Sequence, residues 1–324
     1  MTQEQTRKNQ LSQKEKEIVR GLDPETKEKI MTPRNDLIFK KLFGSVGRES
    51  IIKDFLEAIL DIQIKSVTLG NETILLPEEI DEKTGILDVR VTLEDGSELD
   101  IEMQNGENSL IIKRSHFYLS RLYQKKIHIG DDYDVLRKAI VIFITGFDIF
   151  PKIEQYHTKW LMTEQQNKDI CFDEMELHFI ELPKFLQTKY DKTRKIDQWL
   201  LFIDYTKKEL IREIMEENEN VREAGESLEK LKNDEHAQYL AWLREKQILD
   251  MNSMKKDGFL KGREQGRAEG HAEGREEGRK EEKKEIVKEL LKAGVSEEII
   301  MQTTKLTKEE LEEIKTEIND NRPQ

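Results

Sequence analysis

The sequence predicts an α/β or α+β core followed by a long helical C-terminal extension. Residues 85–94 and 98–104 alternate apolar with polar side chains, which is typical of two half-buried strands. Residues 137–147 are apolar at most positions, as in a strand that is covered on both faces. From about residue 190 the pattern is almost entirely helical up to residue 257. The order helix, strand, strand, helix, strand favours a sheet covered by helices.

Charge dominates the composition of the 324-residue chain. It carries 54 Lys and Arg against 67 Asp and Glu, a formal net charge of −13. The charged fraction of 37% exceeds the roughly 25% of a typical globular domain, so part of the chain is expected to be an exposed, charged extension. The acidic balance excludes a globally basic nucleic-acid coat but allows a local basic groove.

The apolar segments and the cysteine content indicate the compartment. The longest apolar run, 139–145, is far shorter than the roughly 20 residues that span a bilayer. The N-terminal 20 residues contain no apolar stretch like that of a secretory signal. The single cysteine, Cys171, excludes an internal disulfide and suits a reducing compartment. We therefore expect a cytoplasmic protein with no membrane partner.

The N-terminal elements follow from turn signals and periodicity. Residues 1–30 form a charged leader with little apolar periodicity, which we expect to be loosely held. A first helix follows the turn at 32–35 and ends at Gly44, and a second covers about 48–60. The later elements are a hairpin of strands at 85–94 and 98–104 around Asp95-Gly96, a helix over 107–129, and strands over 137–147 and 174–181.

Glycine recurs every four residues from Gly258 to Gly278. Each costs roughly 0.8–1.0 kcal/mol against alanine within a helix. A flexible charged linker is therefore favoured over a helix that offers a small-residue stripe to a partner helix. In the tail, Gly294 is expected to end a helix, Ser296 to begin a short one, and Thr307 with Glu310 to form a capping box. The predicted domains are a leader over 1–30, a core over 31–190, a helical extension over 191–257, the glycine-repeat linker over 258–279 and a helical tail module over 280–324.

The register of the hairpin decides which side chains meet. A strict two-residue loop at Asp95-Gly96 would pair polar with apolar residues, which a half-buried hairpin does not tolerate. One extra residue, with Gly96 in a left-handed bulge, gives an apolar face instead. The predicted pairs are then Leu93 with Leu99, Val91 with Ile101 and Val89 with Met103 on that face, and Arg90 with Glu102 and Asp88 with Gln104 on the other.

This polar face offers ligands for a hard cation. Asp88 and Glu102 supply carboxylates, and Gln104 supplies an amide oxygen. Mg²⁺ prefers such oxygen ligands, and it polarises phosphates and activates water for hydrolysis. The pattern alone leaves two alternatives, a metal site and a solvated strand face, and it favours the second.

Asp88 followed by Glu102-Met103-Gln104 resembles the D…(D/E)-x-K signature of the PD-(D/E)XK nuclease superfamily. More narrowly, the chain resembles the Rpn family of recombination-promoting nucleases, also described as transposases. Similarity extends over about 31–318, including the glycine repeat and the tail. The segments that carry it are 35–44, 85–90, 100–104 and 176–184. The resemblance implies a PD-(D/E)XK, restriction-endonuclease-like core over 31–190.

The resemblance also implies roles for particular residues. Asp88 and Glu102 would be the two metal ligands for Mg²⁺ or Mn²⁺, and Gln104 would complete the catalytic set. Gln104 departs from the superfamily's lysine and carries no positive charge, so Lys113 or Arg114 is expected to supply it. Asp36 matches the family motif as an outer metal ligand; the alternative is an acid placed by the dipole of its helix.

The helix predicted over 107–129 is basic, and it offers a surface for phosphates. Its candidates for DNA contact are Lys113, Arg114 and Arg121, to which we add Lys40 on the first helix. The leading hypothesis is a metal-dependent DNA endonuclease associated with transposition or recombination. The alternatives are a catalytically weak DNA-binding or assembly protein that retains the nuclease fold, and a helical scaffold. Self-association through the C-terminal helices is a further expectation.

Overall fold

The computed structural model describes residues 11–70, 89–107 and 109–320. The chain divides between Leu249 and Asp250 into two compact units. Asp88 lies outside the described residues, so its predicted pairing with Gln104 is outside them as well. Across the described part of the chain, every helix is too short or too polar to cross a membrane.

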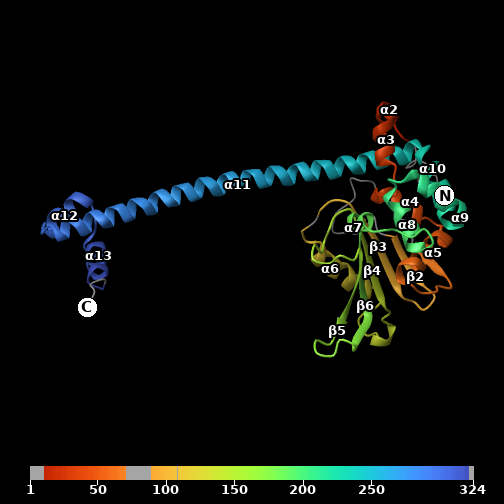
Figure 1. Cartoon of the computed structure of the whole chain (residues 1–324), viewed down its shortest axis with the longest axis horizontal. Coiled ribbons are helices and arrows are strands. Elements are labelled where there is room, and N and C mark those ends of the chain that lie inside the picture. Colours follow the sequence, from red (N-terminus) through yellow and green to blue (C-terminus); the bar gives the residue numbers. More distant parts are fainter. Residues whose placement is uncertain (1–10, 71–88, 108, 321–324) are drawn as a thin grey trace. The chain divides into compact units, whose positions relative to one another are not determined.

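The first unit is built on a six-stranded sheet of order β1-β2-β3-β4-β6-β5 (Figure 1). Strands β3, β4 and β6 run parallel in its centre, while β1 and β2 on one side and β5 on the other are antiparallel to their neighbours. The predicted α/β class is thus confirmed, and β4 is buried at every position. The strands are β1 (Val67–Leu69), β2 (Val89–Leu93), β3 (Glu98–Gln104), β4 (Ala139–Thr145), β5 (His157–Thr163) and β6 (Cys171–Glu181).

Helices cover both faces of this sheet, with α6 (Ile111–Tyr123) on one face and α4 (Asp36–Phe43), α5 (Glu49–Leu60) and α8 (Lys195–Asp204) on the other. Asn35 caps α4 by accepting hydrogen bonds from the backbone of Leu37 and Ile38. Aromatic rings from α4, α5 and α8 pack together. Trp199 of α8 contacts Phe43 of α4 and Phe55 of α5 edge to face. These contacts fix α4, whose first residue belongs to the candidate site.

The β2–β3 hairpin corrects the predicted register. Val89 pairs with Ile101 and Val91 with Leu99, so the strands are shifted by two residues from the prediction, and Arg90 lies opposite Asp100 rather than Glu102. Gly96 has the predicted left-handed conformation, with φ of 86°. The extra loop residue is Glu94, before the Asp-Gly pair, rather than a residue after it. A two-residue shift keeps every side chain on its predicted face, because strand periodicity is two.

Other elements differ from the prediction in extent. Helix α6 is shorter than the 107–129 predicted, and β1 and β5 were not predicted. Strand β5 is an edge strand with mostly exposed or half-buried residues, so it lacks a clear apolar alternation. The leader is partly ordered into α2 (Gln13–Gly21) and α3 (Pro24–Ile30), and the buried side chains of Val19 and Ile30 show that it is packed rather than loosely held.

The helices that follow β6 share the core of the sheet. They are α7 (Leu182–Gln187), α8, α9 (Lys208–Glu217), α10 (Glu219–Lys232) and the start of α11 (Glu235–Lys292). Ile214, Leu228 and Leu240 belong to the same hydrophobic cluster as Phe43 and Ile101. The first unit therefore extends to Leu249, whereas the sequence placed a boundary at residue 190.

The second unit contains the rest of α11, α12 (Glu297–Thr304) and α13 (Lys308–Asp320). The glycine repeat is helical, so of the two alternatives the structure has the helix and not the flexible linker. Gly294 has φ of 77° at the end of α11, and Ser296 precedes α12, both as predicted. The predicted capping box is also confirmed, because Thr307 and Glu310 exchange backbone and side-chain hydrogen bonds.

A buried carboxylate ties β6 to its neighbours. Glu176 is 2% exposed, shares a hydrogen bond with His178 at 2.7 Å, and forms ion pairs with Lys138 at 2.8 Å and with Lys159. Burial alone would raise the pKa of Glu176, but these donors override burial and hold the pKa far below its ordinary value of 4.5.

Glu176→Gln is expected to lower the melting temperature by about 5 °C or more at pH 7, because it leaves two lysines without their buried partner. A carboxylate with a depressed pKa stabilises the fold above its ordinary pKa and loses that contribution as the pH falls. The difference between wild type and variant should therefore shrink below about pH 4.5. Circular dichroism melts from pH 7 to pH 3 measure this, and a pH-independent difference would contradict the electrostatic explanation.

Candidate active site

Strand β3 separates acids from apolar residues. Leu99, Ile101 and Met103 lie in the main hydrophobic cluster, and the alternating residues Glu98, Asp100 and Glu102 face the side of the sheet that α6 covers. All three acids are buried, with exposed fractions of 3% to 6%. The predicted face of Glu102 is therefore confirmed, although the sequence did not single out Glu98 and Asp100.

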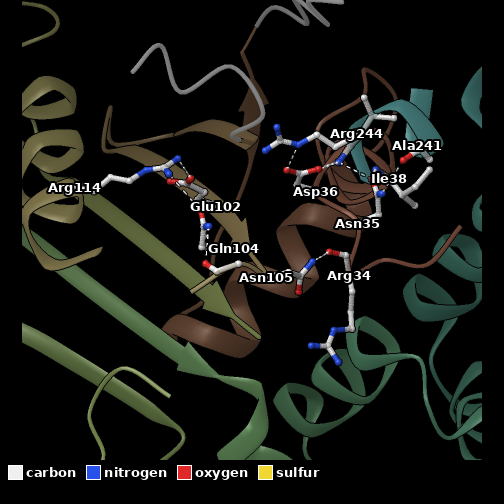
Figure 2. Close-up of polar contacts among 12 residues, drawn as sticks. Arg34, Asn35, Asp36, Ile38, Glu102, Gln104, Asn105, Arg114, Ala241 and Arg244 are labelled. Carbon is white, nitrogen blue, oxygen red and sulfur yellow. Dashed lines mark hydrogen bonds and ion pairs between the residues drawn. The ribbon is translucent and has the colours of Figure 1, made fainter. Parts of the chain in front are cut away.

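Glu102 is held in an environment that disfavours its charge. Burial raises its pKa to about 8, and the neighbouring carboxylates of Asp100 and Asp36 act in the same direction, against Arg114 and Arg244. Its Oε1 accepts a hydrogen bond from Arg114, as Figure 2 shows. Its Oε2 is buried and has no hydrogen-bond partner among the described residues. A buried carboxylate oxygen with no donor is suited to a cation, since an unpaired buried polar atom is otherwise costly.

Arg114 brings positive charge to the end of the strand. Its Nη1 donates to Gln104 Oε1 at 3.4 Å and its Nε donates to the Tyr118 hydroxyl at 3.1 Å. Gln104 in turn donates from Nε2 to the carbonyl oxygen of Gly106 at 3.0 Å, which orients the amide oxygen toward Arg114. Lys113, the neighbouring residue, is exposed. Of the two predicted sources of positive charge, the structure thus brings Arg114 to Gln104.

Asp36 lies at the start of α4 and forms an ion pair with Arg244. Its Oδ1 accepts from the backbone of Leu37 at 2.9 Å, and its Oδ2 accepts from Arg244 Nε at 2.7 Å (Figure 2). Sequence reasoning missed Arg244. Its signal was present, because Arg244 stands at helical spacing from Ala237, Leu240 and Ala241, which form the buried face of α11.

The structure therefore brings Glu102 and Gln104 together through Arg114, which contacts both. Asp36 is near enough to Glu102 to affect its pKa. Within the described ranges, no three His, Cys, Asp or Glu side chains already form a metal-binding cluster. Asp88, the remaining predicted ligand, falls in the gap between residues 70 and 89.

The predicted DNA-contacting residues differ in exposure. Lys113 and Arg121 are exposed on α6, and Arg121 stacks over the ring of Phe117. Arg121 also lines a small cavity of about 70 Å³ together with Arg90 and Asp100. Lys40 is buried on α4, at 8% exposed, so its amine has little surface to offer a phosphate. Of the predicted DNA-contacting residues, the two exposed ones thus lie on α6.

Comparison with known proteins adds one finding. The family model of the PD-(D/E)XK nuclease family transposase matches residues 33–258, which is more than half of the chain. No curated protein and no solved structure matches the chain significantly. The matched region contains β2 and β3, α6 and the first turns of α11, which together supply Glu102, Gln104, Arg114 and Arg244.

Proposed function

Since the chain belongs to the PD-(D/E)XK nuclease family of transposases, we propose that it is a metal-dependent DNA endonuclease acting in transposition or recombination. The observation that carries this proposal is Glu102 Oε2, a buried carboxylate oxygen with no hydrogen-bond partner among the described residues. Glu102 has a raised pKa, as acids at functional sites often have. Mg²⁺ or Mn²⁺ is the proposed cation.

The donor set fits such a cation. Glu102 and Asp36 supply carboxylate oxygens, with Asp88 proposed as the third acid, and hard cations take oxygen ligands. When bound, the cation would polarise the phosphodiester and lower the pKa of a nearby water. Arg114 would contact the phosphate oxygens on which negative charge increases, since a guanidinium matches phosphate with two parallel hydrogen bonds.

If Arg114 on α6 supplies the positive charge at the phosphate, a lysine at position 104 on β3 should be able to replace part of it. Arg114→Gln is expected to lower the rate of Mg²⁺-dependent nicking of a supercoiled plasmid by about a hundredfold or more, because it removes charge stabilisation at the phosphate. Adding Gln104→Lys to that variant should restore part of the rate. Lys168→Gln, a change in an exposed lysine between β5 and β6, is the matched control and should nick as wild type does.

The same assay tests the proposed function. Nicking that requires Mg²⁺ and falls in the Arg114 variant supports an endonuclease. A pure wild-type chain that binds DNA but does not nick it with Mg²⁺ or Mn²⁺ would favour the alternative, a DNA-binding or assembly protein that retains the fold. Gln104 is the feature that favours this alternative, because the strand itself carries no cation.

A further inference from the structure

Asp36 and Arg244 form a shielded ion pair beside the proposed cation site. Their side chains are 11% and 16% exposed, and their bonding atoms are 2.7 Å apart. A second bond lies one residue away, where Asn35 Nδ2 donates to the carbonyl oxygen of Ala241 at 3.4 Å. Both contacts come from one turn of α11, as Figure 2 shows. Helix α11 is therefore bonded to the N-terminal end of α4, and one of the two bonds is to the Asp36 carboxylate.

Glu102, Asp36 and Asp100 each lie next to an arginine, and the three arginines come from different elements. Arg114 of α6 bonds Glu102, Arg244 of α11 bonds Asp36, and Arg90 of β2 lies 4.0 Å from Asp100. These guanidinium groups balance the carboxylates of the metal-free chain. A divalent cation bound by Glu102 and Asp36 would lie beside the two arginines that bond these acids, and like charges repel strongly where solvent is excluded.

We propose that Arg244 is a positioning residue that holds Asp36 in the metal-free protein and releases it when a divalent cation binds. The inference rests on the proposed function, because it takes Asp36 and Glu102 as cation ligands. The released guanidinium becomes available to a DNA phosphate, the other partner that arginine binds with two hydrogen bonds. Since Arg244 belongs to α11, loading of the site is coupled to the position of that helix.

The first test measures cation affinity without DNA. Arg244→Gln removes the competitor, so Mn²⁺ titrated into the full chain, with free Mn²⁺ quantified by electron paramagnetic resonance, should bind about tenfold more tightly than to wild type. Arg244→Lys keeps the charge and should bind close to wild type. Arg34→Gln is the matched control, because Arg34 pairs with buried Asp204 at 3.3 Å outside the proposed ligands, and it should leave Mn²⁺ affinity unchanged.

The second test uses the wild-type chain, so that it holds even where the glutamine variant fails to fold. The Nε proton of Arg244 is hydrogen-bonded to Asp36 and should give a protected NMR signal, assigned by its loss in Arg244→Lys. Saturating Mg²⁺ is expected to remove this protection. A signal that stays protected and unshifted with Mg²⁺ bound would overturn the inference.

Glu102→Gln separates failure of the inference from failure of the proposed function. If it loses Mn²⁺ binding while Arg244→Gln binds as weakly as wild type, the cation site stands and the role of Arg244 is wrong. If Glu102→Gln and wild type bind Mn²⁺ equally, the cation lies elsewhere, and the inference fails together with the proposed site.

Discussion

Glu102→Gln is expected to abolish Mg²⁺-dependent nicking, by at least about a hundredfold, while raising the melting temperature of the metal-free protein. The two effects have one cause. Glu102 is buried, and its pKa is raised from 4.5 to about 8 in the folded chain. An acid with a raised pKa binds its proton more tightly in the folded state, so stability falls as the pH rises from 4.5 toward 8. A neutral glutamine of the same shape removes this penalty.

Glu98→Gln, on the same face of β3, is a control for which the opposite change in melting temperature is expected. Burial would raise the pKa of Glu98, but Lys126 and Lys125, which follow α6, lower it below its ordinary value. Glu98→Gln should therefore lower the melting temperature near neutral pH and leave nicking near the wild-type rate. Asp88→Asn is expected to match Glu102→Gln in activity.

Melting in EDTA and in Ca²⁺ completes the experiment. Ca²⁺ should stabilise wild type and have little effect on Glu102→Gln, because a ligand that binds only the folded state stabilises it. A Glu102→Gln variant that nicks DNA as fast as wild type would place the chemistry elsewhere. A variant that is inactive but also less stable would indicate a structural role.

A chain cut after Tyr190 is expected to be unfolded or insoluble, whereas a chain cut after Lys256 should fold and nick DNA. Helices α8 to α11 supply Trp199 and many apolar residues to the main cluster. Trp199 also donates its indole hydrogen to buried Asp54 at 2.9 Å. Each large buried apolar side chain is worth about 2–5 kcal/mol, so losing several exceeds the roughly 5–15 kcal/mol that stabilises a domain.

The cut after Lys256 leaves the first unit whole, because that unit ends at Leu249. Its nicking rate should equal that of the full chain. Light scattering on both proteins then tests the proposal that the C-terminal helices mediate self-association. A soluble 1–190 fragment with a cooperative melt would show that the core needs no later helix. Loss of nicking in a folded 1–256 chain would make the C-terminal unit part of the active form.

Local patterns predicted much of the fold. Helix α5 and buried strand β4 were found within two residues at each end, because periodicity and apolar content are strong signals over such lengths. The alternation in β3 also predicted which face carries Glu102. The hairpin register was wrong, because an extra loop residue on either side of Asp95-Gly96 gives the same two faces.

Contacts between distant segments could not be predicted from local sequence patterns. Arg244 and Asp36 are separated by 208 positions, and no local pattern connects them. Arg114 was one of two neighbouring candidates, since the phase of α6 decides which of them faces Gln104. The orphaned oxygen of Glu102 likewise depends on how α6 packs over β3, which only the folded structure shows.

The cation beside Gln104 comes from an arginine, and this has a consequence for acid–base chemistry. A lysine amine gives up its proton when its surroundings lower its pKa, so it can serve as a base. A guanidinium in a protein stays protonated. Arg114 can therefore attract and orient an oxyanion throughout the pH range in which the protein is folded, but it cannot deprotonate a water. In a hydrolase built on this face of β3, that task belongs to other groups.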